Sequence, residues 1–260
     1  MTTRCLRLLV WVCAALIFAS HLFGAEPVVQ QLPVGTLLPA ILNSDINSSK
    51  SKMGQKISAK LKQDVPLGDN GRVKAGSELL GHVVSVQAGS PAKVVLVFDT
   101  LKADGRTYPL TTSLRAIASM QAVYQARLPI NGSTPDNLSV WDWTTRQIGG
   151  EIVFGGKRKV ESTVGVVGTM VEPGWVIGVA RSNPEAGCGD PENKSIQAFW
   201  IFSTDACGAY GWEGMQVLPA ADDAAAGKIT LTSPKRIDIR SGSGLLLNVE
   251  KQQASGTGAP

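Results

Sequence analysis

Histidine is scarce in this sequence of 260 residues, which contains only His21 and His82. His21 lies in or beside the apolar amino-terminal stretch, so a processed chain would keep His82 alone. Histidine is the commonest metal ligand and the usual general acid or base near neutral pH. We expect His82, which stands among strand-forming apolar residues, to face outward on a strand. The sequence therefore predicts neither a histidine-based metal site nor histidine-dependent catalysis.

Cysteine is also scarce, and the four cysteines show no Cys-x-x-Cys spacing, so the usual redox motif is absent. Cys5 and Cys13 belong to the amino-terminal stretch. Cys188 and Cys207 remain, an even number in a chain that we expect to be exported, and an oxidising compartment favours a disulfide between them. That bond would close a loop of about 20 residues and stabilise an irregular segment by about 3 kcal/mol.

Catalytic and phosphate-binding motifs are missing as well. No Gly-x-Ser-x-Gly elbow precedes a helical pattern. Glycines at residues 150–156 come before Lys157, but Arg158 stands where a phosphate-binding loop needs a serine or threonine for magnesium. Asp222 with Asp223, or Asp136 with Asp142, could form an acid/base pair, but one sequence does not show that two carboxylates converge at the separation that glycoside hydrolysis requires. We predict that the protein is not an enzyme and binds no cofactor.

The amino-terminal stretch has the layout of a secretory signal. Arg4 and Arg7 precede an apolar run that reaches Phe23, and polar sequence begins at Glu26. We predict a signal peptide over residues 1–25 and a periplasmic or secreted protein. The alternative is an uncleaved membrane anchor, for which about 16 apolar residues are short of the roughly 20 that a span needs. Without this segment the chain carries a net charge of about +2, which gives no reason to expect nucleic-acid binding.

Short strand patterns dominate the rest of the sequence. Three of them follow a glycine and a serine or threonine, at residues 34–38, 75–80 and 241–247. We predict that each glycine adopts backbone angles closed to other residues and that each leucine pair begins a buried strand. Residues 56–62, 228–232 and 235–240 alternate between apolar and polar side chains, as half-buried strands do. Asp104-Gly105 is typical of a tight hairpin turn.

These patterns recur about every ten residues without a long amphipathic helix, so we predict an all-β antiparallel β-barrel or sandwich. One domain over residues 26–250 is favoured over two small ones, with an irregular, disulfide-stapled insertion in residues 113–227 and a disordered tail at 251–260. Residues 113–127 predict at most one short helix. We further predict an edge or bent strand within residues 28–42, because of Pro33 and Pro39, a hairpin around residues 172–174, and an aromatic strand at residues 196–202.

Tryptophan offers the one candidate surface. Trp141 and Trp143 bracket Asp142 in loop-like sequence, and in an extended segment both rings would point to the same side. Such rings stack on sugars or anchor protein interfaces. The alternative, which also applies to Trp175, Trp200 and Trp212, is packing in the core or at the barrel rim.

Several of these segments together resemble the TrbI-like β-barrel domain of conjugation and type IV secretion channels. They are the Gly-Thr-Leu-Leu-Pro-Ala-Ile-Leu run from Gly35, the Ala-Gly-Ser-x-Leu-Leu-Gly-x-Val strand from Ala75, the Asp-Gly-Arg-Thr-Tyr-Pro-Leu run from Asp104, and the closing Gly-Ser-Gly-Leu-Leu-Leu strand. The chain is also similar to stand-alone exported bacterial proteins that share this barrel core. The resemblance covers residues 32–112 and 228–250 and implies a fold rather than pore-forming residues.

From these observations we predict a non-enzymatic cell-envelope protein that acts as an interaction or assembly module. The expected partner is an envelope protein. The alternative is a domain that binds or degrades carbohydrate through its tryptophans, with a glycan as ligand. Contact with a membrane is expected only through an uncleaved amino-terminal segment.

Overall fold

The computed structural model describes residues 32–68, 71–130, 144–150, 152–156, 159–162, 165–172, 175–176, 198–218 and 227–251. The chain divides into two compact units, Met1–Gln30 and Gln31–Pro260, and all of the described residues belong to the second unit. The predicted signal peptide and the tail beyond Lys251 lie outside the described residues. Within those residues no helix combines the length and apolarity that a membrane crossing requires.

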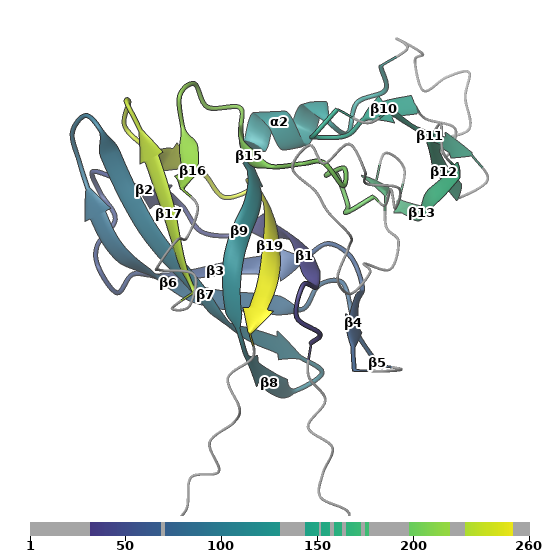
Figure 1. The fold of residues 1–260 in the computed structure, drawn as a ribbon, viewed down its shortest axis with the longest axis horizontal. Coiled ribbons are helices and arrows are strands. Elements are labelled where there is room, and N and C mark those ends of the chain that lie inside the picture. Colours follow the sequence, from purple (N-terminus) through teal and green to yellow (C-terminus); the bar gives the residue numbers. More distant parts are fainter. Residues whose placement is uncertain are drawn as a thin grey trace, which may run out of the picture. The chain divides into compact units, whose positions relative to one another are not determined.

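A ten-stranded sheet forms most of this unit and confirms the all-β prediction (Figure 1). The strand order is β15-β9-β19-β1-β3-β6-β7-β17-β16, with β8 pairing to β7. All pairs are antiparallel except β15 with β9. The strands are β1 (Leu37–Leu42), β3 (Lys56–Leu61), β6 (Glu78–Gln87), β7 (Ala92–Ala103), β8 (Arg106–Pro109), β9 (Thr111–Ala118), β15 (Gly208–Tyr210), β16 (Gln216–Leu218), β17 (Lys228–Ser233) and β19 (Gly244–Lys251).

The sheet curls into a nearly closed barrel because the bent segment formed by β8 and β9 pairs with two different strands of the sheet. β8 pairs with β7, β9 pairs with β19, and only Leu110 separates β8 from β9. At the bend, the Leu110 N–H donates to the Asp99 carbonyl over 2.9 Å, and the Thr112 hydroxyl donates to the Phe98 carbonyl over 2.8 Å. Closure leaves few backbone groups exposed at sheet edges, which are otherwise prone to pair with other chains.

Smaller sheets accompany the barrel. β2 (Ile46–Asn47) pairs with β18 (Asp238–Ile239), and β4 (Val65–Leu67) pairs with β5 (Gly71–Val73). A five-stranded sheet joins β10 (Thr144–Arg146), β11 (Ile152–Gly156), β12 (Lys159–Ser162), β13 (Gly165–Glu172) and β14 (Trp175–Val176) in that order. The antiparallel pairing of β13 with β14 confirms the hairpin predicted around residues 172–174.

The three glycine turns share one geometry. Gly35, Gly76 and Gly242 have φ angles of 82°, 90° and 91°, a region that glycine enters without strain. In each turn the residue after the glycine donates its N–H to the carbonyl three positions back, over 3.1 to 3.2 Å. The glycine N–H donates to a neighbouring strand, at Val249, Leu61 and Leu42 respectively, over 2.7 to 2.8 Å. The predicted need for glycine at these positions is confirmed.

The Asp104-Gly105 hairpin is confirmed as well. Asp104 and Gly105 have φ angles of 49° and 73° and join β7 to β8. Two successive positive φ values define the turn type that matches the twist of antiparallel strands.

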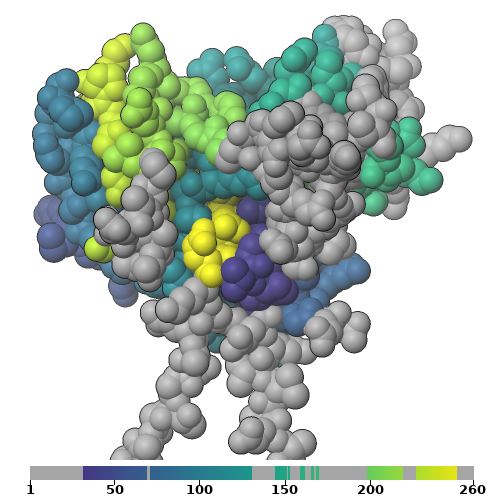
Figure 2. Space-filling model, in the orientation of Figure 1, coloured from purple at the N-terminus to yellow at the C-terminus, as the bar shows by residue number. Residues whose placement is uncertain are grey.

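The first strand is central, and the prediction of an edge strand was wrong. β1 pairs with β19 on one side and with β3 on the other. Pro39 is tolerated because it lies where the pairing with β3 ends, and its carbonyl accepts the Lys62 N–H over 2.9 Å just beyond that strand. The first and last strands, purple and yellow in Figure 2, lie side by side.

Residues 113–127 form a strand before they form a helix. Leu114 and Ile117 belong to β9, and α2 spans only Met120–Gln125. The Ser119 side chain caps this helix by accepting the Ala122 N–H over 3.1 Å. The end of β9, from Ala116 to Ala118, is buried throughout, and periodicity does not distinguish such a run from a helix. α2 is the one helix in the described part of the chain.

The predicted aromatic strand at residues 196–202 is instead a tight turn in its described part, residues 198–202. The N–H groups of Phe199 and Phe202 each donate to the other residue's carbonyl, over 2.8 and 2.9 Å, and Trp200 has a φ of 54°. Gln63 reaches this turn from the barrel: its Oε1 accepts the Trp200 N–H over 2.7 Å. These aromatic residues have high strand propensity, but burial of their rings and this hydrogen bond determine the backbone here.

Candidate functional site

The sequence-predicted site lies outside the described residues. This holds for Trp141, Asp142 and Trp143, and also for Cys188. Cys207 is described, and its N–H donates to the Tyr210 hydroxyl over 3.0 Å. The Cys188–Cys207 disulfide and the tryptophan surface therefore stay predictions.

Two of the other tryptophans have structural roles. The Trp200 side chain is completely buried and packs edge-on against Phe202, with ring centres 6.3 Å apart. Trp212 is partly buried against the core, and its Nε1 donates to the Asp238 carbonyl over 3.2 Å. Burial leaves no face of the Trp200 ring on which a sugar could stack, and the core contact and hydrogen bond of Trp212 indicate a packing role.

His82 faces outward on β6, as predicted. Its side chain is 44% exposed, and Nδ1 lies 3.4 Å from Oδ2 of Asp99. The Thr100 hydroxyl donates to the other oxygen of the Asp99 carboxylate, Oδ1, over 2.7 Å. This hydroxyl is therefore not directed at the His82 imidazole. Among the described residues no three metal-binding side chains form a cluster.

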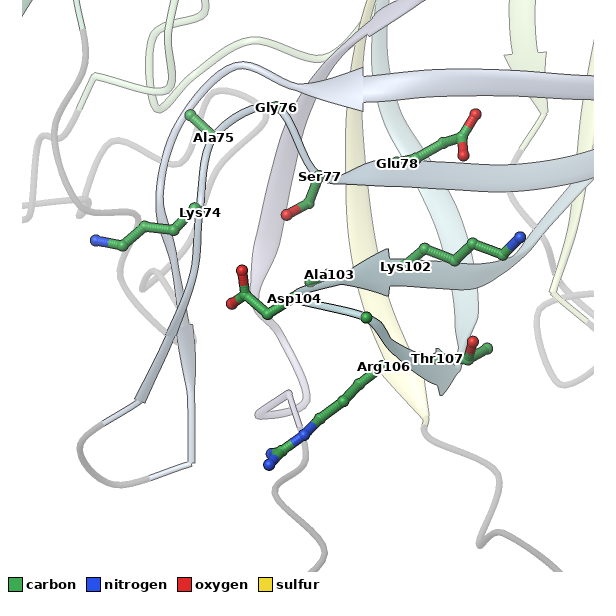
Figure 3. Close-up of a pocket in the computed structure, with 11 residues that line it drawn as sticks. Lys74, Ala75, Gly76, Ser77, Glu78, Lys102, Ala103, Asp104, Arg106 and Thr107 are labelled. Atoms are coloured by element: carbon green, nitrogen blue, oxygen red, sulfur yellow. The ribbon is translucent and has the colours of Figure 1, made fainter.

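One polar groove lies between the turns at residues 74–77 and 103–106 and has a volume of about 740 Å³ (Figure 3). Lys74 is held at its rim, since its Nζ lies 3.0 Å from Asp64. Glu78 and Lys102 stand opposite each other on β6 and β7, and Arg106 points outward. The groove is open, and its charges are mixed, which suits a polar contact surface better than chemistry in a water-free site.

A smaller groove, of about 290 Å³, includes Asp238 in its lining. The Asp238 Oδ1 accepts a hydrogen bond from the Asn47 side chain over 3.1 Å. Its Oδ2 lies 3.3 Å from the terminal nitrogen of Arg240 and 3.9 Å from that of Arg236. The hydrogen bond from Asn47, together with the charges of Arg240 and Arg236, lowers the pKa of the Asp238 carboxyl, although partial burial opposes this effect.

Asp238 should make stability depend on pH on the acid side. A lowered pKa in the folded state stabilises the protein fully above the ordinary aspartate value of about 3.9, and this stabilisation is lost as pH falls through the lowered value. Relative to Asp238→Asn, we expect the natural protein to gain about 1 kcal/mol at pH 7 and to lose this advantage below about pH 4. Urea unfolding between pH 7 and pH 2.5 measures the difference. Asp104→Asn, which keeps the turn chemistry, is the matched control; a difference for Asp238→Asn that is independent of pH would contradict the assignment.

Four exposed apolar residues lie in α2 and in the segment that follows it. Met120, Tyr124, Leu128 and Ile130 are 52%, 61%, 42% and 49% exposed, and we name these four residues the α2 surface. Val123, in the same helix, is buried in the core. Met120 and Tyr124 are spaced by four within α2 and therefore share one side of the helix, whereas Leu128 and Ile130 follow after the helix ends. Large apolar side chains that gather outside the core mark contact sites for partners.

The groove around Asp238 and the α2 surface were not predicted from the sequence, although the sequence contains a signal for each. Arg236, Asp238 and Arg240 alternate with isoleucines, so they share one face of a strand. The spacing of Met120, Tyr124 and Leu128 was available too, but the preceding strand obscured where the helix begins.

No family model and no curated protein matches the chain. One solved structure that matches is ComB10 of the Com type IV secretion system of Helicobacter pylori, with 19% sequence identity and a TM-score of 0.25. The match covers 31% of this chain and 43% of that chain.

Proposed function

We propose that this protein is a non-enzymatic, exported cell-envelope β-barrel of the TrbI-like kind that acts as an interaction or assembly module. The α2 surface is the observation that carries the proposal. Tyr and Met are enriched at protein interfaces, where they provide contact area at a small cost in conformational entropy. The Tyr124 hydroxyl makes no hydrogen bond with a described residue, so it is available to a partner.

The α2 surface stands on a firm base, as an assembly contact requires. The Ser119 N–H donates to the Tyr210 carbonyl over 2.9 Å, which fixes the start of α2 to β15. A Cβ added to Gly242 would lie 3.2 Å from Cγ of Met120, so this side chain already rests on the third glycine turn. The backbone of α2 and the Met120 side chain are therefore held before a partner binds, which lowers the entropic cost of binding.

Site-specific photo-crosslinking tests the proposal. A photoreactive phenylalanine at position 124 should give one discrete protein adduct in envelope preparations of the source cells. The same group at position 93, an exposed lysine on β7, should not. Leu128→Ser should weaken the adduct at position 124 without changing thermal stability, because the side chain is 42% exposed.

The carbohydrate alternative has a separate readout. If the protein stayed monomeric and formed no adduct at position 124, while its tryptophan fluorescence shifted with cell-wall glycans, the assembly proposal would be wrong. Loss of that shift in Trp141→Ala and Trp143→Ala variants would then identify the tryptophan surface as the binding site.

A further inference from the structure

We propose that the smaller groove binds an oxyanion, a carboxylate or phosphate group, between Arg236 and Arg240. These two residues flank β18 and direct their terminal nitrogens to the same oxygen of Asp238. Lys50 lines the groove from the loop that follows β2. Three cations from two parts of the chain thus meet in one groove.

The cations exceed the anions that face them. Asp238 and Asp45 are the two carboxylates lining the groove. The Asp45 carboxylate keeps its charge, but its Oδ1 accepts the uncharged Ser241 N–H over 2.7 Å, and no ion pair links it to either arginine. Asp238 is therefore shared between two guanidinium groups, and a further anion would relieve their mutual repulsion.

Most donors of the two guanidinium groups remain available. Each arginine has five N–H donors, and carboxylates and phosphates accept from them in pairs. Arg240 makes one hydrogen bond to Asp238, over 3.3 Å, and Arg236 lies at 3.9 Å, beyond hydrogen-bond distance. The two side chains are 67% and 59% exposed, so a ligand can reach them from solvent.

The floor of the groove is fixed in place, which distinguishes it from a chance meeting of surface charges. Asn47 holds Asp238 through its side-chain nitrogen and accepts the Ser49 N–H on its oxygen over 2.9 Å. The Asn47 N–H donates to the Ser51 hydroxyl oxygen over 3.0 Å, so that hydroxyl can still donate its own proton to an anion. A volume of about 290 Å³ fits one oxyanion with its stem.

Heteronuclear NMR titration with inorganic phosphate tests the site at low salt, because screening weakens exposed charge pairs. We expect saturable amide shifts at residues 47–51 and 236–240. Arg236→Gln with Arg240→Gln should weaken binding about tenfold or more. Asp238→Asn should instead strengthen binding, because it removes the competing carboxylate while preserving the shape of the side chain. Arg72→Gln, on β5, is the matched control and should change nothing.

The double arginine variant and Asp238→Asn should change the affinity for phosphate in opposite directions. This distinguishes a binding site from a structural contact, because loss of a structural contact would lower the affinity in both cases. A hexaglutamate peptide as second probe distinguishes the sources of the oxyanion: much tighter binding of the peptide than of phosphate indicates an acidic segment of a protein, and equal affinity indicates a free anion. Absence of saturable shifts with both probes, or shifts that persist in the double arginine variant, would overturn the proposal. The variants leave α2 unchanged, so this result is independent of the crosslinking result.

Discussion

Replacing Leu246 by alanine should lower the free energy of unfolding by about 2 to 5 kcal/mol. Leu246 is fully buried in β19, opposite Pro39 of β1 and Ala116 of β9. Two strands thus hold its backbone, and the surrounding core cannot collapse into the cavity that the smaller side chain leaves. Urea unfolding followed by circular dichroism should show a lower midpoint with an unchanged slope.

Leu80 provides the matched control. It occupies the second position of the corresponding leucine pair, but in β6 it is only partly buried, opposite Thr100 on the outer face of the barrel. Leu80→Ala should therefore cost about 1 kcal/mol or less. Equal losses for Leu246→Ala and Leu80→Ala would mean that the burial assigned to β6 and β19 is wrong.

Trp200→Ala should be comparably severe, with a loss of about 3 to 5 kcal/mol. The indole is fully buried between the turn at residues 199–202 and the barrel, and the Lys62 ammonium lies 5.9 Å from the ring centre. The variant would also loosen the turn that Gln63 binds, where the Gln63 side-chain nitrogen donates to the Ala198 carbonyl over 3.3 Å. Thermal unfolding monitored by circular dichroism measures the loss.

Trp212 is the corresponding control, because it is partly exposed and makes one side-chain hydrogen bond. Trp212→Ala should cost about half as much as Trp200→Ala or less. A Trp200→Ala protein with the stability of the natural one would show that the turn is not part of the barrel core.

The parts of the fold that follow from local chemistry were predictable. Alternation alone identified β3 and β17, whose apolar residues all face the core. The requirement of Gly35 and Gly76 for a positive φ followed from the residue type. These properties depend on a few neighbouring residues, so the sequence contains them directly.

Properties that depend on distant partners were not predictable. Leu37 and Leu38 are both buried, whereas of Leu79 and Leu80 only the first is, because β1 is covered on both faces at this point and β6 on one. The leucine pair looks the same in both cases. Sequence pattern likewise could not predict the tight turn at Phe199, which a glutamine 137 residues away stabilises.

The same distinction applies to the candidate sites. Arg236, Asp238 and Arg240 alternate within five residues, so the face that they share could be predicted from the sequence. Their partner Asn47 lies 191 residues away, and only the pairing of β2 with β18 brings it to the carboxylate. The α2 surface could not be predicted from the sequence, because the pattern did not show that β9 ends at Ala118 and that the helix begins at Met120.

The pairing of the first strand of the nearly closed barrel with its last strand makes these two strands neighbours, although they stand at opposite ends of the sequence. Leu37 faces Asn248, and the Gly35 N–H donates to Val249 over 2.7 Å, so the chain enters and leaves the barrel at one place. Ala88 and Gly89, between β6 and β7, are exposed. A circular permutant opened there, with residues 32 and 251 joined by a short linker, would keep every strand pair of the barrel. The barrel is thus defined by which strands are neighbours, and its sequence order is one of several that the same architecture permits.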